Sequence, residues 1–257
     1  MMSHSLKLLI DADMFAYKAC TSVTKEIDWG NNLYTFHTDI EEAKAYFEDA
    51  IDYTLESALQ KHKFSGDYEP IFCFTDDNGR NFRKKLLPTY KANRGKKPLA
   101  YGALKTYIKD NYESCQMDNL EADDCMGILS TLPNNKDNCI LISGDKDMNT
   151  LAGYHYDFLK DEYYYVTQEE ADFFFLQQVL TGDTTDGYSG CPSIGKVTAV
   201  KLLTESPTWE TVIKAYKRKG LTEQEALVQA RVARILRAGE YDFKLGRVIL
   251  WKPKEEC

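Results

Sequence analysis

The chain has only four histidines among its 257 residues, and none of its seven cysteines belongs to a CxxC pair. Zinc sites usually combine spaced histidines with paired cysteines, so we expect no zinc site. No apolar run approaches the ~20 residues of a membrane span, and the first residues lead into an apolar segment instead of a signal peptide. Several cysteines lie in apolar segments, as reduced thiols do in cytosolic proteins. These features predict a soluble cytoplasmic protein without membrane contact.

The composition, with 43% hydrophobic and 28% charged residues, is that of a globular protein with a sizeable core. Strands are predicted at 6–10, from 70 to 75, at 114–117 and at 139–142, and helices are predicted after the cap Asp39, at 99–112 and from 121 to 132. This alternation predicts an α/β fold whose central sheet is mostly parallel and flanked by helices. Beyond residue 166 the pattern is mostly helical, with capping boxes at Thr167 and Thr222. We expect an α/β core at 1–180 and a helical region at 181–257 that packs on it.

Three carboxylates, Glu121, Asp123 and Asp124, fall within four positions just before an apolar helical run. Acidic side chains commonly begin a helix, because they offset the positive end of its dipole. Three of them in one turn repel one another, and a bound cation relieves that repulsion. From these residues alone, a solvated helix start and a cation site are equally good interpretations.

Six further aspartates follow predicted strands or a predicted helix: Asp11, Asp76, Asp145, Asp147, Asp183 and Asp186. The carboxyl ends of parallel strands meet at one edge of the sheet, which is where open α/β sheets bind ligands. Nine converging carboxylates cannot all ionise without cations, and an oxygen-only ligand set suits Mg²⁺, with Mn²⁺ as a substitute. The pattern therefore predicts a two-metal site for phosphodiester cleavage, in which an ion-activated water attacks in line and the second ion stabilises the leaving 3′ oxygen.

The net charge of −8 seems at first to exclude a nucleic-acid partner. Subtracting the nine predicted metal ligands leaves +1 for the rest of the chain, and that charge is unevenly distributed. Residues 78–109 contain no Asp or Glu, and they contain ten basic residues with four aromatic residues among them. The basic residues are Arg80, Arg83, Lys84, Lys85, Lys91, Arg94, Lys96, Lys97, Lys105 and Lys109. Because this segment begins two residues after Asp76, it predicts a phosphate-binding surface more than a merely solvated one.

The loop from Gly190 to Val197 matches the beginning of a phosphate loop, GxxxxGK. Val197 stands where that motif needs Ser or Thr for Mg²⁺, and the loop follows a polar turn instead of a buried strand. We interpret it as a glycine-rich hairpin between two helices. Gly190, Gly195 and the next helix start would hold a backbone phosphate through N–H groups, with Lys196 and Lys201 nearby. A plain helix–helix turn is the simpler alternative.

Five ordered acidic motifs together resemble the flap endonuclease and 5′→3′ exonuclease family: Asp11–Asp13, Phe74–Asp76, Glu121–Asp124, Ser143–Asp147 and Gly182–Asp186. Residues 190–195 resemble the helix-three-turn-helix DNA-binding hairpin of that family. Further stretches, 88–94, 182–190, 233–243 and 250–253, are most similar to the 5′→3′ exonucleases of short-tailed bacteriophages. The resemblance covers nearly the whole chain.

The resemblance implies a PIN-like 5′-nuclease fold and a Mg²⁺-dependent enzyme that attacks duplex DNA at 5′ ends or flaps and also cuts RNA in RNA–DNA hybrids. It implies a role in phage DNA replication and recombination, in the cytoplasm of the bacterial host, and it also allows a K⁺ ion at the hairpin. It places the nine carboxylates on the metal-cluster positions of the family. Lys91 and Arg94 fall on the basic pair of the family's arch, which gives them catalytic roles. If the turn that carries them is helical, their side chains point the same way, and Tyr90 beside them can stack on a terminal base. The basic segment is shorter than the threaded arch of larger members.

Two alternatives remain. A metal-dependent ribonuclease of the PIN class has fewer carboxylates and lacks the hairpin, so residues 190–195 speak against it. A non-catalytic DNA-binding protein would be hindered by nine carboxylates beside its ligand. No Ser/His/Asp or Cys/His grouping suggests a side-chain nucleophile. Protein partners and oligomeric state do not follow from the sequence.

Overall fold

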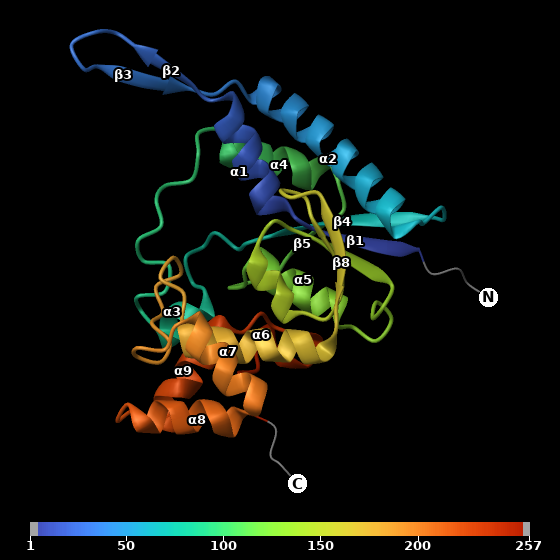
Figure 1. Cartoon of the computed structure of the whole chain (residues 1–257). Helices are drawn as coiled ribbons and strands as arrows, with labels where there is room; N and C mark the ends of the chain where they lie inside the picture. Colours follow the sequence, from blue (N-terminus) through green and yellow to red (C-terminus); the bar gives the residue numbers. More distant parts are fainter. Residues whose placement is uncertain (1–4, 254–257) are drawn as a thin grey trace.

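The computed structural model describes residues 5–253. Its centre is a six-stranded sheet with strand order β5-β4-β1-β6-β7-β8 (Figure 1). The strands are β1 (Leu6–Asp11), β4 (Tyr68–Phe74), β5 (Ser114–Gln116), β6 (Cys139–Ile142), β7 (Gly153–Asp157) and β8 (Glu162–Val166). The first five are mutually parallel where they pair, and β8 runs antiparallel to β7. The predicted α/β class and the mostly parallel sheet are confirmed.

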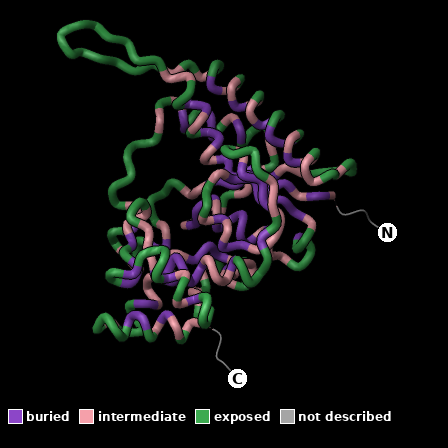
Figure 2. The backbone as a smooth tube through the Cα atoms, in the orientation of Figure 1, coloured by how far each residue is buried: buried purple, intermediate pink, exposed green. Residues whose placement is uncertain are grey.

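Three helices cover one face of the sheet: α1 (Ala12–Val23), α2 (Ile40–His62) and α4 (Tyr101–Asn111). Their apolar side chains pack on Leu8, Ile10 and Phe72, which alternate with residues that point to the other face. As predicted, Asp39 caps α2, because its carboxylate accepts from the N–H groups of Glu41 and Glu42. Figure 2 shows buried positions along this helix–sheet boundary, with further buried stretches in the helices below the sheet.

The other face of the sheet packs against α5 (Ala122–Ser130) and the segment that follows α9. Leu9, Ile71 and Leu141 of the sheet form one apolar cluster with Met126 of α5 and Leu236. The predicted helix after Glu121 is therefore present, and its amino end lies at the carboxyl edge of the strands. A 3₁₀ helix, Lys146–Thr150, follows β6 at the same edge.

A group of helices adjoins this layer (Figure 1): α6 (Gln168–Thr181), α7 (Lys196–Glu205), α8 (Trp209–Arg218) and α9 (Glu223–Ala233). They share a core that includes Leu180, Leu203 and Tyr216. The capping boxes predicted at Thr167 and Thr222 begin α6 and α9. Because α6 shares this core, the helical part of the described chain begins at residue 168. The division of the chain near residue 180 stays a prediction.

The remaining elements are short. They are β2 (Lys25–Asp28), β3 (Tyr34–His37), α3 (Phe82–Leu86), the 3₁₀ helix Ala238–Glu240, β9 (Tyr241–Asp242) and β10 (Arg247–Val248). The β2–β3 hairpin projects from the body and is exposed along its length (Figures 1 and 2). No helix in residues 5–253 combines the length and the apolar character needed to cross a membrane.

Candidate active site

The carboxylates predicted as metal ligands lie around the carboxyl edge of the parallel strands. Asp11 ends β1, Asp76 lies two residues after β4, and Asp145 begins the 3₁₀ helix after β6, with Asp147 in its first turn. Glu121, Asp123 and Asp124 lie at the start of α5, and Asp183 and Asp186 lie in the loop that follows α6. This convergence arises because parallel strands end at the same edge.

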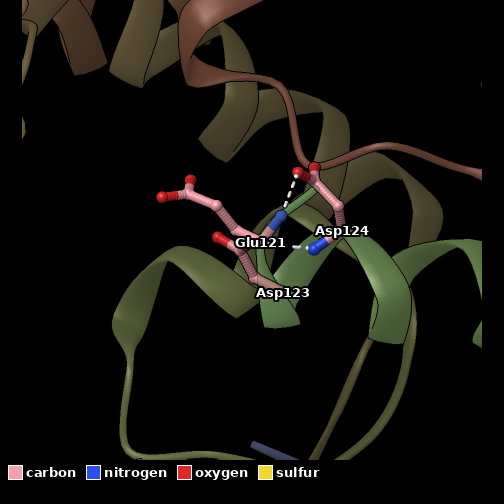
Figure 3. A group of neighbouring side chains, drawn as sticks. All are labelled: Glu121, Asp123 and Asp124. Atoms are coloured by element: carbon pink, nitrogen blue, oxygen red, sulfur yellow. Dashed lines mark hydrogen bonds between the residues drawn. The ribbon is translucent and has the colours of Figure 1, made fainter. Parts of the chain in front are cut away.

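The start of α5 separates its three carboxylates (Figure 3). One oxygen from each of Glu121, Asp123 and Asp124 lies within 4.8 Å of the others. Glu121 and Asp123 point to one side of the helix start, whereas Asp124 turns toward the C-terminal segment (Figure 3). Asp124 Oδ2 accepts from the Glu121 N–H at 3.2 Å, and Oδ1 accepts from the Leu236 N–H at 3.1 Å.

Arg83 binds Asp124 from inside the protein and is only 1% exposed. Its Nη1 and Nη2 donate to Asp124 Oδ2 and Oδ1 at 2.6 and 2.7 Å. Its Nε and Nη2 also donate to the carbonyl oxygens of Val232 at 2.9 Å and Arg234 at 2.7 Å. The prediction that Arg83 contacts DNA is therefore wrong, because protein atoms enclose its guanidinium. Asp124 as a metal ligand stays a prediction: one of its oxygens lies within 4.8 Å of oxygens of Glu121 and Asp123, although both of its oxygens also accept hydrogen bonds from Arg83 and from backbone N–H groups.

Tyr90, Lys91 and Arg94 lie on the acidic side of the α5 start. Lys91 Nζ lies 2.7 Å from Glu121 Oε1 and 3.6 Å from Asp186 Oδ2. Arg94 Nη2 lies 3.0 Å from Asp186 Oδ1, so the predicted basic pair converges on one aspartate. Lys91 lies in a turn with φ +50°, and not in a helix. Arg94 is exposed, whereas the Lys91 side chain is largely enclosed.

Tyr90 is buried, with 3% of its surface exposed, and its hydroxyl donates to Glu121 Oε2 at 2.7 Å. The prediction that it stacks on a terminal base is wrong, because its ring lies inside the protein. Burial alone would raise the pKa of Glu121. The positive charges of Lys91 and Arg83 outweigh burial and hold that pKa below its usual range. Glu121 is thus ionised and neutralised by the chain itself.

Other carboxylates of the edge lack such neutralisation. Burial raises the pKa of Asp11 to about 7, and the nearby charges of Asp13 and Asp145 raise it as well. Burial followed by repulsion from Asp145 raises the pKa of Asp147 to about 7. The pKa of Asp123 is also raised, first by burial and then by the charges of its acidic neighbours. Each of these groups is repelled by other carboxylates of the edge, and bound divalent cations would keep it ionised. The donor set, all carboxylate oxygen, fits Mg²⁺ or Mn²⁺.

Asp76 and Asp183 are held by hydrogen bonds from backbone N–H groups. Asp76 Oδ2 accepts from the Asn119 N–H at 2.7 Å, which ties the end of β4 to the start of α5. Asp183 Oδ1 accepts from the N–H groups of Thr185 and Asp186. These bonds, with Lys146 nearby, lower the pKa of Asp183 although burial alone would raise it.

The structure adds residues that sequence analysis did not assign to the site. Asp13 accepts from the Thr75 N–H at 3.0 Å and from the Tyr101 hydroxyl, so it fastens α4 to the catalytic edge. Ser143 donates its hydroxyl to Asp11 Oδ2 at 3.0 Å, and Gln178 Nε2 donates to Asp147 at 2.7 Å. Asp13 and Ser143 belong to acidic motifs and were visible in the sequence. Tyr101 and Gln178 carry no signal, because only the packing of α4 and α6 brings them here.

Several predicted DNA contacts are exposed. Arg80 and Lys84 are exposed in the basic segment, and Lys196 and Lys201 are exposed on α7. Gly195 is the N-cap of α7 and is also exposed. These residues therefore stay predicted DNA contacts.

Gly190 has a different role from the one predicted. It is buried, and its N–H donates to Gln229 Oε1 at 2.9 Å, so this N–H is not free for a phosphate. Gly190 has φ +63°, and a Cβ added there would lie 2.3 Å from the Gly182 backbone nitrogen. The position needs glycine because two backbone segments meet closely. The prediction of a phosphate contact is wrong for Gly190.

A parallel sheet with carboxylates gathered at its carboxyl edge, flanked by exposed basic residues, defines a metal-dependent nuclease. Comparison with known proteins identifies the family. Residues 7–174 match the family described as 5′-3′ exonuclease, N-terminal resolvase-like domain. The match covers more than half of the chain, and the chain belongs to this 5′→3′ exonuclease family. The enzyme is thus a metal-dependent hydrolase of phosphodiester bonds, and neither the PIN-class ribonuclease nor the non-catalytic alternative applies.

Two phage proteins are similar to this chain over nearly their whole length. The exodeoxyribonuclease of Enterobacteria phage T3 is 28% identical, over 96% of this chain and 93% of that protein. The exonuclease of Escherichia phage T7 is also 28% identical, with the same coverage of both chains. The 5′-3′ exonuclease of Bacillus subtilis strain 168 is 27% identical over 56% of this chain and 54% of that protein. The predicted likeness to phage exonucleases is confirmed.

Solved structures show the same fold. The T5 5′-exonuclease with bound divalent zinc ions superposes with a TM-score of 0.62 at 17% identity, covering 90% of this chain and 89% of that chain. The T5 D15 flap endonuclease, in a pseudo-enzyme–product complex with DNA and metal ions, gives 0.62 at 16% identity, with 88% of each chain covered. At 16–17% identity this similarity establishes the fold but not the roles of individual residues.

Proposed function

We propose that this enzyme uses Mg²⁺ to hydrolyse duplex DNA from 5′ ends, including flaps, and that it also cuts the RNA strand of RNA–DNA hybrids. Its place would be phage DNA replication and recombination in the host cytoplasm. The observation that carries the proposal is the meeting of Glu121, Asp186 and Lys91 at the carboxyl edge of the sheet. Lys91, a basic residue that could bind a phosphate, thus lies next to two carboxylates of the proposed metal site.

Nine carboxylates would hold the metal ions in this proposal: Asp11, Asp76, Glu121, Asp123, Asp124, Asp145, Asp147, Asp183 and Asp186. When bound, the ions would lower the pKa of water and stabilise developing charge on the phosphate oxygens. The metal-bound T5 structures support a cation site in this fold, and the donor atoms found here support Mg²⁺ or Mn²⁺. Asp124 would also hold, with Arg83, the turn that carries Glu121 and Asp123.

Lys91 and Arg94 would position the phosphate. Lys91 Nζ already bonds a carboxylate of the site, and Arg94 is exposed beside it. An arginine can bind phosphate through two parallel hydrogen bonds, whereas a lysine offers a compact charge. Donors fixed before the reaction stabilise charge that develops in the transition state. The exposed residues Arg80, Lys84, Lys196 and Lys201 would attract the flanking duplex.

The α6–loop–α7 segment would act as the helix-three-turn-helix hairpin of this family. The start of α7 supports this role, because Gly195 caps the helix without a side chain and Val197 beside it is 86% exposed. N–H groups at a helix start can bind a backbone phosphate, and a K⁺ ion at this loop would join protein and phosphate. The proposed division into a nuclease core, 1–180, and a DNA-binding region, 181–257, follows the same assignment.

One cleavage assay tests the proposal. Duplexes labelled at one 5′ end or one 3′ end, with and without a 5′ flap or an RNA segment, would be digested in Mg²⁺. We expect early loss of the 5′ label as mononucleotides or short oligonucleotides, and cleavage of annealed RNA. Steady loss of the 3′ label with the 5′ label retained would refute the proposed polarity. An RNA segment left intact would remove the hybrid from the substrate class.

A further inference from the structure

Gln178 lies near the end of α6, between two groups of the carboxylates that would hold metal ions. Its side-chain Nε2 donates to Asp147 Oδ1 at 2.7 Å, and Asp147 belongs to the 3₁₀ helix after β6. Its backbone carbonyl accepts from the Gly182 N–H at 2.8 Å, where the loop that carries Asp183 and Asp186 begins. One residue thus contacts both the 3₁₀ helix and the start of this loop.

The amide of Gln178 is buried, with 6% of the residue exposed, and only its Nε2 makes a hydrogen bond. Among the buried side-chain nitrogen and oxygen atoms of residues 5–253, Gln178 Oε1 is the one without a hydrogen-bond partner. The orientation of the amide follows from its neighbour, because reversing it would place Oε1 against the Asp147 carboxylate, which only accepts hydrogen bonds. A buried carbonyl oxygen without a donor lowers stability, and an apolar side chain of similar length would avoid that loss. The stability of α6 therefore does not explain this glutamine.

Gln177, the preceding residue of α6, lacks this contact with the metal site. It is buried to a similar degree, with 8% exposed, and its side chain makes no hydrogen bond to another residue within 5–253. The two glutamines share one helix and one residue type, and they differ in the bond to Asp147. Gln177 therefore provides a matched control for Gln178.

The bond from Gln178 leaves the other oxygen of Asp147 available. Oδ1 accepts from Gln178, whereas Oδ2 accepts no hydrogen bond from the described part of the chain. The Asp147 N–H donates to Asp145 Oδ1 at 2.9 Å, so the backbone at this position is also held. A carboxylate that binds a metal ion is usually oriented by a hydrogen bond, and loss of such a partner typically costs roughly 10–100-fold in metal affinity or activity. Gln178 is placed to supply that bond.

We propose that Gln178 is a positioning residue of the metal site, which fixes the Asp147 carboxylate for metal binding through the bond from Nε2 to Oδ1. This role rests on the proposed function, in which Asp147 is a metal ligand. Gln178 acts through Asp147, and its unsatisfied Oε1 follows from the need for an amide donor at a position where the surrounding protein offers no donor in return. The residue thus serves the metal site at some cost in stability.

The test measures Mn²⁺ binding to the full chain without DNA, by the electron paramagnetic resonance signal of free Mn²⁺. We expect Gln178→Met to weaken the binding of at least one ion by roughly tenfold or more, because the Asp147 carboxylate is no longer held. Gln177→Met removes the neighbouring amide and should bind Mn²⁺ as the parent protein does. In EDTA, the thermal unfolding midpoint of Gln178→Met should stay within about 4 °C of the parent value, because the lost hydrogen bond is offset by removal of the unsatisfied oxygen.

Gln178→Asn provides a second variant, which keeps a polar amide but is too short to reach Asp147 from the same helix position. It should weaken Mn²⁺ binding as Gln178→Met does. For both variants, the Mg²⁺ concentration that gives half-maximal cleavage should rise by a similar factor. Parent-like Mn²⁺ affinity in a folded variant of Gln178 would overturn the positioning role, and a lowered unfolding midpoint in that variant would show that the residue only stabilises α6.

Asp147→Asn separates this role from the proposed function. If Asp147→Asn binds Mn²⁺ more weakly while both Gln178 variants bind it as the parent does, the role of Gln178 is wrong and the metal site stands. If Asp147→Asn itself binds Mn²⁺ as the parent does, Asp147 is not a metal ligand, and the role of Gln178 is wrong as well. Weaker binding in all three variants, with Gln177→Met unchanged, is the expected result.

Discussion

Arg83 and Asp124 form a buried bidentate ion pair, with N–O distances of 2.6 and 2.7 Å. The pair joins three parts of the chain: the basic segment that contains Arg83, the acidic start of α5, and the backbone at 232–236, where Arg83 and Asp124 make further hydrogen bonds. It fixes the turn that presents Glu121 and Asp123.

Removing one member of this pair should lower the free energy of unfolding. Arg83→Gln leaves the Asp124 carboxylate buried without its counter-charge, so we expect the free energy of unfolding to fall by about 3–5 kcal/mol. Urea denaturation measures it. Lys84→Gln changes the exposed neighbouring residue and should shift stability by no more than about 0.5 kcal/mol. If Arg83→Gln is as stable as the parent protein and binds DNA more weakly, Arg83 contacts DNA and does not mainly stabilise the fold.

Cleavage should require both a divalent metal ion and the carboxylate of Asp145. Activity should need Mg²⁺ or Mn²⁺ and disappear in EDTA. Asp145→Asn should abolish cleavage while DNA binding is kept or improved, because one repulsive charge is removed from the edge near Asp11. Filter binding and single-turnover cleavage measure the two effects separately. Glu56→Gln, an exposed position on α2, serves as the control. Full activity of Asp145→Asn at ordinary Mg²⁺ would exclude the proposed metal site.

Lys91 should affect the chemical step more than binding. We expect Lys91→Ala to reduce single-turnover cleavage by roughly 10²-fold or more with little change in affinity, because a preorganised donor is removed. Lys84→Ala should mainly weaken binding, since Lys84 is exposed in the same segment. If both variants lose only affinity and cleave normally at saturating DNA, Lys91 adds general attraction alone.

The amino end of α7 should contribute salt-dependent affinity. Replacing both Lys196 and Lys201 with alanine should flatten the plot of log affinity against log salt concentration by ~0.9 for each phosphate that the protein no longer neutralises. The cleavage rate at saturating DNA should stay unchanged. Lys214→Ala on α8, where the lysine is paired with Glu210, provides the control. If the slope is unchanged in the double variant, these two lysines of α7 do not bind DNA phosphates.

Acid should destabilise the protein through His155. This side chain is buried, and burial lowers its pKa from 6.5 to about 4, although its hydrogen bond to the Leu151 carbonyl opposes the shift. Because the unfolded chain binds this proton more readily, the contribution of His155 to stability should fall as pH decreases from about 6.5 to about 4 and change no further below that. The effect amounts to roughly 3 kcal/mol. Urea titrations of the parent and of His155→Gln at both ends of this range should show that the variant lacks this contribution.

Local sequence patterns predicted much of the fold and of the metal site. Capping residues at Asp39, Thr167 and Thr222 begin the expected helices, because a cap acts within one turn of the chain. The aspartates that follow strands meet as expected, because parallel strands share a carboxyl edge whatever their order in the sheet. Such features depend on neighbours in sequence or on the fold class alone.

Neighbouring residues with the same charge lie in different environments in the folded protein, and only the tertiary packing decides which of them is buried. Arg83 is buried and Lys84 is exposed, although both belong to one basic run. Asp123 faces the site and Asp124 faces Arg83, because successive side chains around a helix start diverge by about 100°. The charge and spacing of such residues predict that they belong to a helix, but they do not predict which side of that helix packs against another segment. That side is decided by contacts between residues far apart in the chain, such as those of Arg83 with Val232 and Arg234.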